Sequence, residues 1–426
     1  MQLVAYGAQD IYLTGNPQIT FFKVVYRRHT NFAMEAIQQT INGTVAVGGS
    51  TVSATISRNG DLVGKLWLDV KLDASVLAGT SSLYMNWTNN TGHAFLKECE
   101  IEIGGQKIDK HYSQWLDIWN ELTDHDENEW IGLNKHAAKN AYLKSGTAVA
   151  AGAATMHNHR LYVQLQFWFC RNPGLALPLI ALQYHEVKVK LTTRNVNALV
   201  NSDVGVTAVE TTAPTVQLWA DYIYLDTDER RRFAQVSHEY LIEQLQKETG
   251  TAPTSQKLNF NHPVKELIWV LQTSTAAVEK TATADAIDAT LNVNGTVATE
   301  GNDYFCYLGK NNNDEIINGV SSDEGFGTAK LVLNGHDRFA ARNATYFRTC
   351  QPIQAGHKVP SKHIYNYSFA LKPEEHQPSG TCNFSRIDNA KLVFTGTTTG
   401  TTSSVYAVNY NVLRIMSGMG GLAYSN

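Results

Sequence analysis

Long apolar runs are absent from this chain of 426 residues. No stretch approaches the roughly 20 consecutive apolar residues that a membrane-spanning helix requires. The first residues also lack the basic segment followed by an apolar segment that marks a secretory signal. Hydrophobic residues nevertheless make up 43% of the sequence, an ordinary share for a folded protein. We therefore expect a soluble globular protein that stays in a cytosol-like compartment.

Cysteine is scarce and irregularly spaced. The chain has five cysteines, an odd number, and no two of them form a CxxC pair. A disulfide framework or a zinc site needs an even set or closely spaced pairs. We expect reduced structural thiols at Cys99, Cys170, Cys306, Cys350 and Cys382.

An excess of positive charge is also missing. The formal net charge is −4, whereas a protein that binds nucleic acid usually carries a basic stripe that neutralises phosphates. The sequence therefore predicts no direct contact with nucleic acid.

One strand-rich pattern occurs twice. A short alternating strand that runs into a tight turn, Ile101–Gly105, reappears as Leu331–Gly335. Glycine suits the positive φ of such a turn. Matching strands lie before and after each copy, namely Val63–Leu68 with Val264–Trp269, and Glu186–Leu191 with Asn389–Phe394. The repeat predicts two β domains joined in tandem.

Length and local signals place the boundary between the two halves near residue 226. A chain of 426 residues suits two domains of about 200 each. Asp226 and Glu229 form a capping-box pattern, and Arg230–Arg232 follow where cations suit the end of a helix dipole. We expect an N-terminal arm and first β domain over 1–225, then a short linker helix and second β domain over 226–426.

Alternating hydrophobicity predicts antiparallel strands with one buried face. In one strand Leu66, Leu68, Val70 and Leu72 share a face, opposite Lys65, Asp69 and Lys71, and in another the apolar positions are Leu161, Val163, Leu165, Phe167 and Phe169. Further strands are predicted near 19–27, 51–58, 98–104, 183–192, 215–225, 238–246, 256–260, 264–272, 329–334, 363–370, 389–395 and 405–416.

One longer amphipathic helix is expected. The helical spacing of Tyr112, Trp115, Trp119 and Leu122 predicts that 111–123 packs on the first domain. Segments of low hydrophobicity should form surface loops at one end of each domain. These segments are 136–157, 197–214, 273–305 and 396–404.

No catalytic, cofactor-binding or metal-binding residue can be nominated. His157 and His159 have the spacing of metal ligands on a strand, but a cupin-type site would add a glutamate a few residues later, and none is present. Asp124–Glu129 lacks the glycine and the spacing of a calcium-binding loop. We interpret these segments as a solvated loop and a helix end, and we expect no enzymatic activity, no cofactor and no obligatory metal.

Asparagine sequons are frequent in this chain. Without a secretory signal they would not meet the glycosylation machinery, so we interpret them as chance matches in a sequence rich in Asn and Thr. They lie at Asn42, Asn86, Asn89, Asn294, Asn343, Asn366 and Asn383.

Both ends of the chain carry features of possible contact surfaces. Lys23, Arg27 and Arg28 lie beside Phe21 and Phe22 and could meet an acidic partner or lipid headgroups, although a strand with a solvated face is the simpler interpretation. The segment 413–424 is apolar and rich in glycine, which predicts that it docks against the body or a neighbour with a close backbone approach.

Several long blocks of sequence carry a family resemblance. They are Leu3–Asp10, Leu13–Lys23, Ile56–Leu62, Pro173–Glu186, Gln377–Asn389 and Asn411–Tyr424. Together they resemble the major capsid protein of nucleocytoplasmic large DNA viruses, nearest to the algal-virus type of phycodnaviruses and chloroviruses. The blocks span both halves and both ends of the chain.

The resemblance implies an all-β fold of two tandem eight-stranded antiparallel jelly rolls, with a few short helices in loops. It also implies homotrimers that form pseudo-hexagonal capsomers and tile an icosahedral virion shell assembled in the host cytoplasm. Three chains of two similar domains approximate sixfold symmetry. Neighbouring capsomers, minor capsid proteins and an internal membrane layer are the implied partners, with the arm 1–18 facing inward and the loops 136–157 and 273–305 facing outward.

Surface glycans are a further implication, because family members carry them on exposed loops. Their sites cannot be transferred, since 136–157, 197–214 and 273–305 lie outside the resembling blocks. Two functions from other classes stay open. One is a glycan-binding β-sandwich on a surface, and the other is a cupin-like enzyme, which the missing glutamate disfavours.

Overall fold

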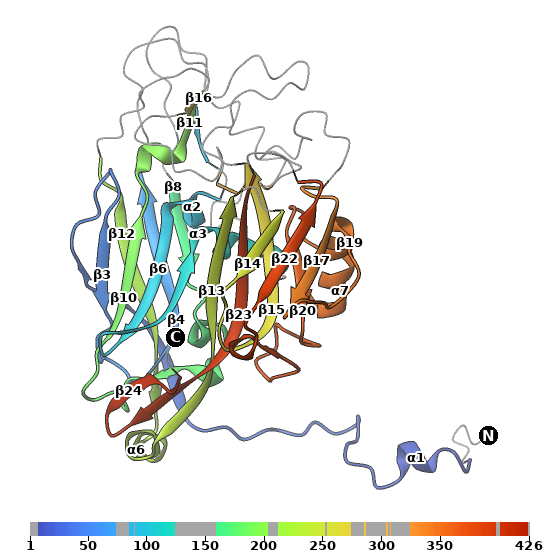
Figure 1. Ribbon diagram of the computed structural model, residues 1–426. Coiled ribbons are helices and arrows are strands. Elements are labelled where there is room, and N and C mark those ends of the chain that lie inside the picture. Colours follow the sequence, from blue (N-terminus) through green and yellow to red (C-terminus); the bar gives the residue numbers. More distant parts are fainter. Residues whose placement is uncertain are drawn as a thin grey trace.

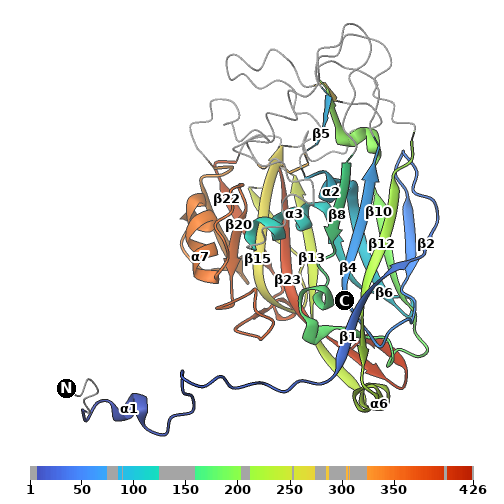
Figure 2. The ribbon, with the colours of Figure 1, turned by 180° about the vertical axis from the view of Figure 1, so that it is seen from behind.

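The computed structural model describes residues 7–73, 85–88, 90–123, 159–202, 212–251, 254–273, 285–286, 304–305, 307, 324–397 and 401–424. Antiparallel strands dominate this part of the chain, and the helices are short (Figure 1). The strands form two pairs of sheets that stand side by side, one pair from each half of the chain (Figures 1 and 2).

The first half forms sheets that we name 1A and 1B. Sheet 1A has the order β1-β12-β4-β8, with β9 also paired to β4, and sheet 1B has the order β2-β3-β10-β6-β7. The strands of 1A are β1 (Phe32–Gln39), β12 (Thr215–Leu225), β4 (Leu62–Leu72), β8 (His159–Gln164) and β9 (Leu177–Pro178). Those of 1B are β2 (Ile41–Asn42), β3 (Thr51–Thr55), β10 (Val187–Thr193), β6 (Leu96–Ile103) and β7 (Gln106–Tyr112).

The second half forms sheets 2A and 2B. Sheet 2A has the order β13-β23-β15-β20, with β21 paired to β15 and β24 to β23, and sheet 2B has the order β14-β22-β17-β18, with β19 paired to β17. The strands of 2A are β13 (His238–Thr251), β23 (Thr401–Met416), β15 (Pro263–Thr273), β20 (Tyr365–Ser368), β21 (Cys382–Asn383) and β24 (Met419–Leu422). Those of 2B are β14 (Ser255–Leu258), β22 (Ala390–Thr395), β17 (Thr328–Leu333), β18 (His336–Asp337) and β19 (Arg342–Asn343).

The two halves share one strand order. Strands β1, β12, β4 and β8 correspond to β13, β23, β15 and β20, and strands β3, β10, β6 and β7 correspond to β14, β22, β17 and β18. The β6–β7 turn has φ of 59° at Gly104 and 82° at Gly105, and the β17–β18 turn has φ of 51° at Asn334 and 82° at Gly335. Such turns favour glycine and asparagine. Each half is an eight-stranded jelly roll, and the duplication predicted from sequence is confirmed.

Short helices and one small sheet complete the described chain. The small sheet lies beyond one end of the rolls and contains β16 (Asp285–Ala286), β11 (Val200–Ser202) and β5 (Met85–Trp87) (Figure 1). The α-helices are α1 (Ile11–Thr14), α2 (Thr91–Phe95), α3 (Ser113–Leu122), α5 (Trp168–Arg171), α6 (Thr227–Gln235) and α7 (Gln351–Ala355). Tighter or wider turns are η2 (Pro173–Leu175), η3 (Val196–Leu199), η6 (Phe384–Arg386) and the π-helical η5 (Tyr346–Cys350).

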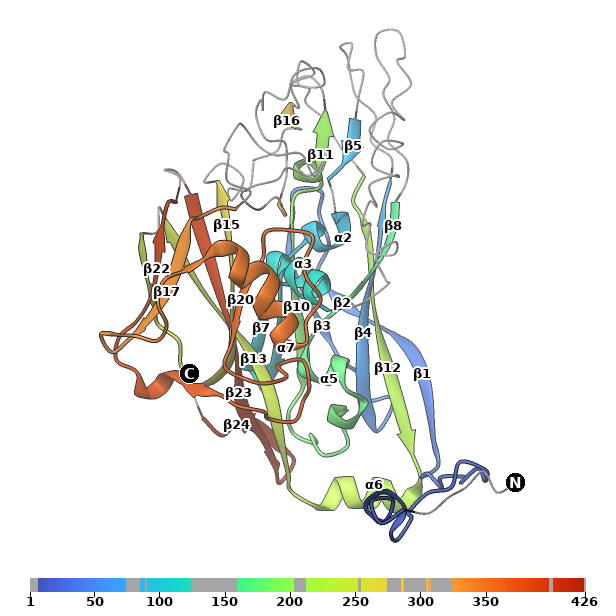
Figure 3. The same ribbon diagram turned by 90° about the vertical axis from the view of Figure 1, so that its right-hand side faces the viewer.

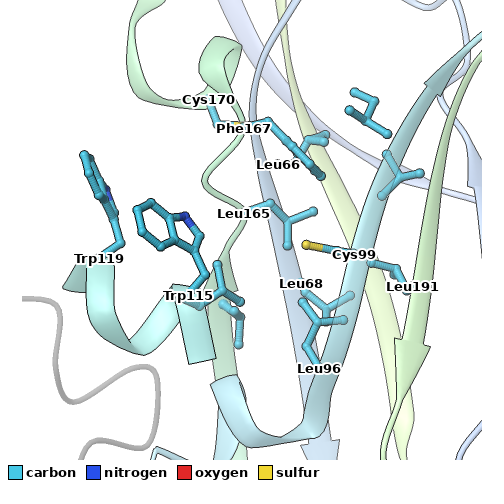
Figure 4. Close-up of a cluster of buried hydrophobic side chains, with 14 of the residues drawn as sticks. Leu66, Leu68, Leu96, Cys99, Trp115, Trp119, Leu165, Phe167, Cys170 and Leu191 are labelled. Carbon is cyan, nitrogen blue, oxygen red and sulfur yellow. The ribbon is translucent and has the colours of Figure 1, made fainter. Parts of the chain in front are cut away.

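One continuous apolar core fills the first roll and its contact with the second. Leu66, Leu68 and Leu165 lie in its centre (Figure 4). Ile268 and Tyr406 of the second roll belong to the same cluster. A separate cluster, which includes Trp269, Leu331 and Phe394, fills the second roll itself. Sheet 2A is therefore buried on both faces, which explains why its central strands β15 and β23 are buried at nearly every position, polar residues included.

Two strand predictions are wrong. Residues 19–27 form no strand and are exposed, and the first strand begins at Phe32. The predicted strand from Leu161 to Phe169 ends at Gln164, and Phe169 lies in α5. The apolar alternation continues past the strand because all of Phe167–Cys170 is buried, so period two no longer reports strand geometry there.

Two predicted surface loops are partly buried. Strand β23 begins at Thr401, and Ser403 is fully buried there, where its hydroxyl bonds the side chain of Gln256. The segment 197–214 begins with the buried residues Ala198 and Leu199. Small polar side chains enter a core when their hydrogen bonds are satisfied, and hydropathy alone does not reveal this. The loop 136–157 and most of 273–305 lie outside the described residues.

Candidate assembly interface

Helix α3 joins the two jelly rolls. Its apolar stripe is buried as the spacing predicts, and Trp115 and Trp119 lie beside the core of the first roll (Figure 4). The helix packs on both rolls rather than on the first alone, because Ile268 and Tyr406 of the second roll belong to the same cluster. The Trp115 ring lies 5.5 Å from the ring of Tyr406 on the outer face of sheet 2A. Burial of large aromatic rings is the strongest apolar contribution that a single side chain makes, so α3 anchors the second roll to the first.

Hydrogen bonds fix the position of this contact. Gln114 Nε2 donates to Gln272 Oε1 at 2.8 Å, and the Tyr406 hydroxyl donates to Gln114 Oε1 at 2.6 Å. Asp117 of α3 is fully buried and accepts from Lys362 Nζ at 2.5 Å and from the Tyr307 hydroxyl at 2.7 Å. Because unpaired buried polar atoms are costly, these bonds favour one relative placement of the rolls.

A buried ionic cluster crosses the same interface. Glu243 of β13 accepts Lys265 Nζ of β15 at 2.7 Å and Arg171 Nη1 of α5 at 3.0 Å. Lys265 also donates to the Pro373 carbonyl at 2.5 Å. Burial lowers the pKa of Lys265, whereas the cations Arg171 and Lys265 outweigh the effect of burial on Glu243 and lower its pKa. One carboxylate therefore holds a cation from each roll.

His357 forms a second buried charged group beside this cluster. Its Nε2 lies 2.8 Å from Glu266 Oε2, and its Nδ1 lies 2.6 Å from Glu374 Oε1. Burial alone would lower the pKa of His357, but the two carboxylates overcome this and raise it to about 9. The imidazolium is thus the stable form at neutral pH.

Helix α6 links the rolls at the base of the molecule (Figure 3). The helix predicted at Asp226 is confirmed, and the Asp226 carboxylate accepts the backbone N–H of Thr227 at 2.7 Å. The helix continues to Gln235, so Arg232 lies in its last turn, as predicted, while Arg230 and Arg231 lie one turn earlier. Arg230 Nε donates at 2.8 Å to Asp61, whose other carboxylate oxygen accepts the Leu225 N–H at 2.9 Å. The linker is therefore tied to the first roll.

The C-terminal segment docks against the first roll, as its apolar, glycine-rich sequence predicts. Strand β24 pairs back on β23, and Tyr184 donates its backbone N–H to the Gly418 carbonyl at 3.0 Å. A Cβ atom at Gly420 would lie 2.7 Å from a methyl carbon of Leu182. The close approach confirms the expected role of the glycines.

The N-terminal arm, residues 7–31, has the opposite character. It extends away from the rolls at the α6 end, with only the short helix α1 (Figure 1). Its apolar side chains are uncovered, and Phe22 is 98% exposed. The basic residues Lys23, Arg27 and Arg28 share this exposed segment instead of a strand. Contiguous exposed apolar residues mark a surface that meets a partner.

Of the metal-binding candidates that the sequence analysis rejected, only His159 lies among the described residues. His157 and Asp124–Glu129 lie outside the described residues, and His159 begins β8. Within the described part of the chain, no group of three or more His, Cys, Asp or Glu side chains has metal-binding geometry. Among the same residues no helix is long and apolar enough to cross a membrane.

The described cysteines are free thiols. Cys99 and Cys170 are buried in the first core (Figure 4), and burial raises the pKa of both thiols, that of Cys170 to about 12. Cys350 is exposed and Cys382 is half-buried, while Cys306 lies outside the described residues. The buried thiols pack as small apolar groups, because a thiolate is disfavoured there.

The sequons differ in accessibility. Asn42, Asn343 and Asn383 are exposed, whereas Asn366 is fully buried and would not accept a glycan in the folded chain. Asn89 and Asn294 lie outside the described residues, and nothing is described of the Asn86 side chain.

Two equal jelly rolls, fused into one body by a continuous core, define the class of double jelly-roll shell proteins. Comparison with known proteins agrees. Residues 20–226 match the family described as major capsid protein N-terminus, and residues 229–421 match the family described as large eukaryotic DNA virus major capsid protein. The chain belongs to the major capsid proteins of large eukaryotic DNA viruses, which form the icosahedral shell of the virion.

Individual relatives are similar along the whole chain. The major capsid protein of Pyramimonas orientalis virus is 49% identical, with 100% of this chain and 99% of the relative covered. That of Paramecium bursaria Chlorella virus 1 is 44% identical, with the same coverage. A chain of the quasi-atomic PBCV-1 virus capsid has a TM-score of 0.72 and 39% identity, over 96% of this chain and 100% of that chain. The predicted fold, family and virion location are confirmed, and the glycan-binding alternative gains no support.

Proposed function

We propose that three copies of this chain associate into a homotrimeric capsomer with a pseudo-hexagonal outline. The supporting observation is the shared strand order of two rolls held in one body by α3 and a continuous core. Six similar rolls in a ring approximate sixfold symmetry, which suits a hexagonal lattice although the true operator is threefold. The similarity to a chain of the PBCV-1 capsid supports contacts between neighbouring capsomers.

Native mass measurement tests the trimer directly. Permanent assemblies commonly bury more than about 2,000 Å², so a trimer should persist on dilution to micromolar concentration. Light scattering should report three times the chain mass. A folded monomer at micromolar concentration would contradict the proposal.

The two rolls are proposed to be separate domains that meet at residue 226. Strand β1 pairs with β12, so the first roll closes within residues 32–225, and α6 follows directly. Because the rolls share a buried interface, we expect them to unfold together. Calorimetry should give one transition, and two well-separated transitions would contradict this coupling.

The arm 1–18, together with the exposed residues that follow it up to residue 31, is proposed to face the capsid interior, where it contacts minor capsid proteins or the layer next to an internal membrane. Its exposed Phe21, Phe22 and Tyr26, together with Arg27 and Arg28, suit such a contact. The loops 136–157 and 273–305 would then face outward and carry any surface glycans. Limited proteolysis of intact particles should cut the loops and spare the arm, and early cleavage before residue 18 would reverse the assignment.

A purely structural role is proposed, without enzymatic activity, cofactor or obligatory metal. Double replacement of His157 and His159 by alanine should leave assembly and melting temperature nearly unchanged. Metal analysis of the purified protein provides the second readout. Stoichiometric zinc, iron or calcium that is lost in the double variant, with a lower melting temperature, would contradict the proposal.

Assembly in the host cytoplasm, without direct contact to nucleic acid, completes the proposal. The net charge of −4 and the buried reduced thiols support it. Immunogold labelling of infected cells should place new shells in the cytoplasm. A filter-binding assay should find no affinity of the purified trimer for duplex DNA at physiological salt.

A further inference from the structure

Sheets 1A and 2A present equivalent residues on their outer faces. In 1A, Trp67 of β4 pairs with Trp219 of β12. In 2A, Ile268 of β15 pairs with Tyr406 of β23. Both pairs lie next to equivalent core pairs, Leu66 with Ala220 and Leu267 with Ala407. The two tryptophans of the first roll therefore occupy the positions of Ile268 and Tyr406 in the second.

The two faces differ in what covers them. Ile268 and Tyr406 are fully buried, because α3 of the first roll packs on them within the same chain. Trp67 and Trp219 are partly exposed and belong to neither of the two large cores. Tyr162 and Met34 share this face and are 38% and 59% exposed. Among the described residues, apolar cover on this face lies at its lower end, where Phe233 of α6 packs beside Ile223.

Helix α7 is the counterpart of α3. Helix α3 follows the β6–β7 hairpin, and α7 follows the equivalent β17–β18 hairpin through η5. It lies on the side of the second roll that faces away from the first roll (Figures 1 and 3). Tyr346, Cys350 and Ile353 follow helical spacing, and Ile353 is 65% exposed although it is apolar. The stripe of α3 is covered, whereas on the η5–α7 segment Tyr346 packs against the second core and Cys350 and Ile353 are exposed.

We propose that the η5–α7 segment of one copy packs on the outer face of sheet 1A of a second copy, reproducing between chains the contact that α3 makes with sheet 2A within one chain. The occupant follows from the duplication. Helix α3 and the outer face of sheet 2A fit each other within one chain, and their counterparts, α7 and the outer face of sheet 1A, lie on opposite sides of the two-roll body with exposed apolar residues. The contact is head-to-tail, so it forms a ring when the rotation closes. The inference rests on the proposed trimer and assigns its interface.

Charge substitutions at both sides of the interface test the pairing. Trp67→Glu and Ile353→Glu should each raise the dissociation constant roughly 30-fold or more, because each places a charge in a desolvated contact. Leu371→Glu is the matched control, since Leu371 is 78% exposed in the second roll but lies outside α7. Light scattering and circular dichroism on all three variants and the wild-type chain report mass and folding.

Cross-linking keeps the test valid if a variant misfolds. Lys65→Cys places a thiol on the exposed face beside Trp67, and a short bismaleimide can bridge it to the native Cys350 of another copy. A head-to-tail ring should give covalent dimers and trimers on a denaturing gel, and Cys350→Ser should abolish them. A face that pairs with itself would stop at dimers.

The outcomes separate this inference from the proposed trimer. A wild-type monomer overturns both. A wild-type trimer that survives Trp67→Glu and Ile353→Glu and gives no cross-link leaves the trimer in place and overturns the assigned surface. Dissociation by only one of the two substitutions overturns the pairing of sheet 1A with α7. Dissociation by both, with the control still trimeric and with trimeric cross-links, supports the inference.

Discussion

Equivalent positions of the two jelly rolls have opposite environments. Glu266 in β15 of the second roll is fully buried, whereas the matching position in β4 of the first roll holds an exposed Lys65. Because the strand order is the same, the fold does not explain the difference in burial. The difference arises because α3 of the first roll covers the outer face of sheet 2A within the same chain. The same strand order thus forms a buried contact on the outer face of sheet 2A and an exposed surface on the outer face of sheet 1A.

The buried charges of the second roll shape its interface more than they stabilise it. Removing two charges from water costs several kcal/mol per ion, and their attraction roughly offsets this only when geometry and hydrogen bonds are good. Glu243 meets this condition through Arg171 and Lys265. A wrong placement of the rolls would leave these charges unpaired, so the cluster disfavours alternative packings.

Glu243→Gln should have the largest effect. It leaves Lys265 buried without its carboxylate, and breaking a buried pair typically costs about 3–5 kcal/mol of the free energy of unfolding. Asp69→Asn in sheet 1A is the matched control, because Asp69 is also buried but its partner Arg160 is largely exposed. That control should cost about 1 kcal/mol. Denaturant titration measures both, and equal losses would contradict the contrast between the two sheets.

The His357 cluster of the second roll predicts a pH dependence of the free energy of unfolding above pH 6.5. The pKa of His357 rises from 6.5 in the unfolded chain to about 9. Its contribution is therefore complete below pH 6.5 and is lost as pH rises through about 9. Between these values the folded chain binds one more proton, so the free energy of unfolding should fall by about 1.4 kcal/mol per pH unit, about 3 kcal/mol in total.

Denaturant titration of wild-type and His357→Gln chains between pH 6.5 and 9 isolates this effect. Their difference removes the contribution of Lys247, whose pKa burial lowers to about 8 and which both chains contain. Equal slopes in the two chains would show that His357 does not hold its proton.

The repeated strands and the helix α3 could be predicted because each is a local pattern. Alternation at Leu66, Leu68 and Val70, and the Ile101–Gly105 turn with its copy at Leu331–Gly335, fix strand identity without tertiary information. The capsid family followed from long sequence blocks. The partial burial of 396–404 and the exposure of 19–27 could not be predicted. Hydropathy does not reveal whether the fold brings another part of the chain against a segment.

The charged interface was also missed by the sequence analysis, although one signal was present. Lys265 and Glu266 interrupt an otherwise apolar strand, which is typical of paired charges in a doubly covered sheet. Their partners Arg171, Glu243 and His357 lie far apart in sequence. Only the fold brings them together, so residue spacing could not reveal the cluster.

The equivalent β6–β7 and β17–β18 turns should differ in how well they tolerate substitution. A Cβ atom at Gly104 would lie 2.3 Å from Nδ1 of His185, which in turn bonds Gly420 of the C-terminal hairpin. Gly104→Asn should therefore cost about 1–2 kcal/mol of unfolding free energy. Asn334→Gly in the second roll should cost less than about 1 kcal/mol, because glycine suits the turn and only the bond from the Asn389 N–H to the Asn334 side chain is lost. Thermal melts of both variants test the difference, and similar losses would show that the first turn has no special constraint.

Asp226→Ala at the junction should have the smallest effect. The Asp226 carboxylate accepts the Thr227 N–H at the start of α6, and loss of an N-terminal cap costs about 1 kcal/mol. The helix itself should persist, because Arg230 still binds Asp61 of the first roll and Phe233 still packs beside Ile223. Asp228→Ala, in the same first turn, is the control and should cost only about 0.3–1 kcal/mol through the helix dipole. Hydrogen exchange of the α6 amides should rise in Asp226→Ala while the strands of both rolls keep their protection. If exchange also rose along β13, the cap would be holding the two rolls together rather than only the helix that links them.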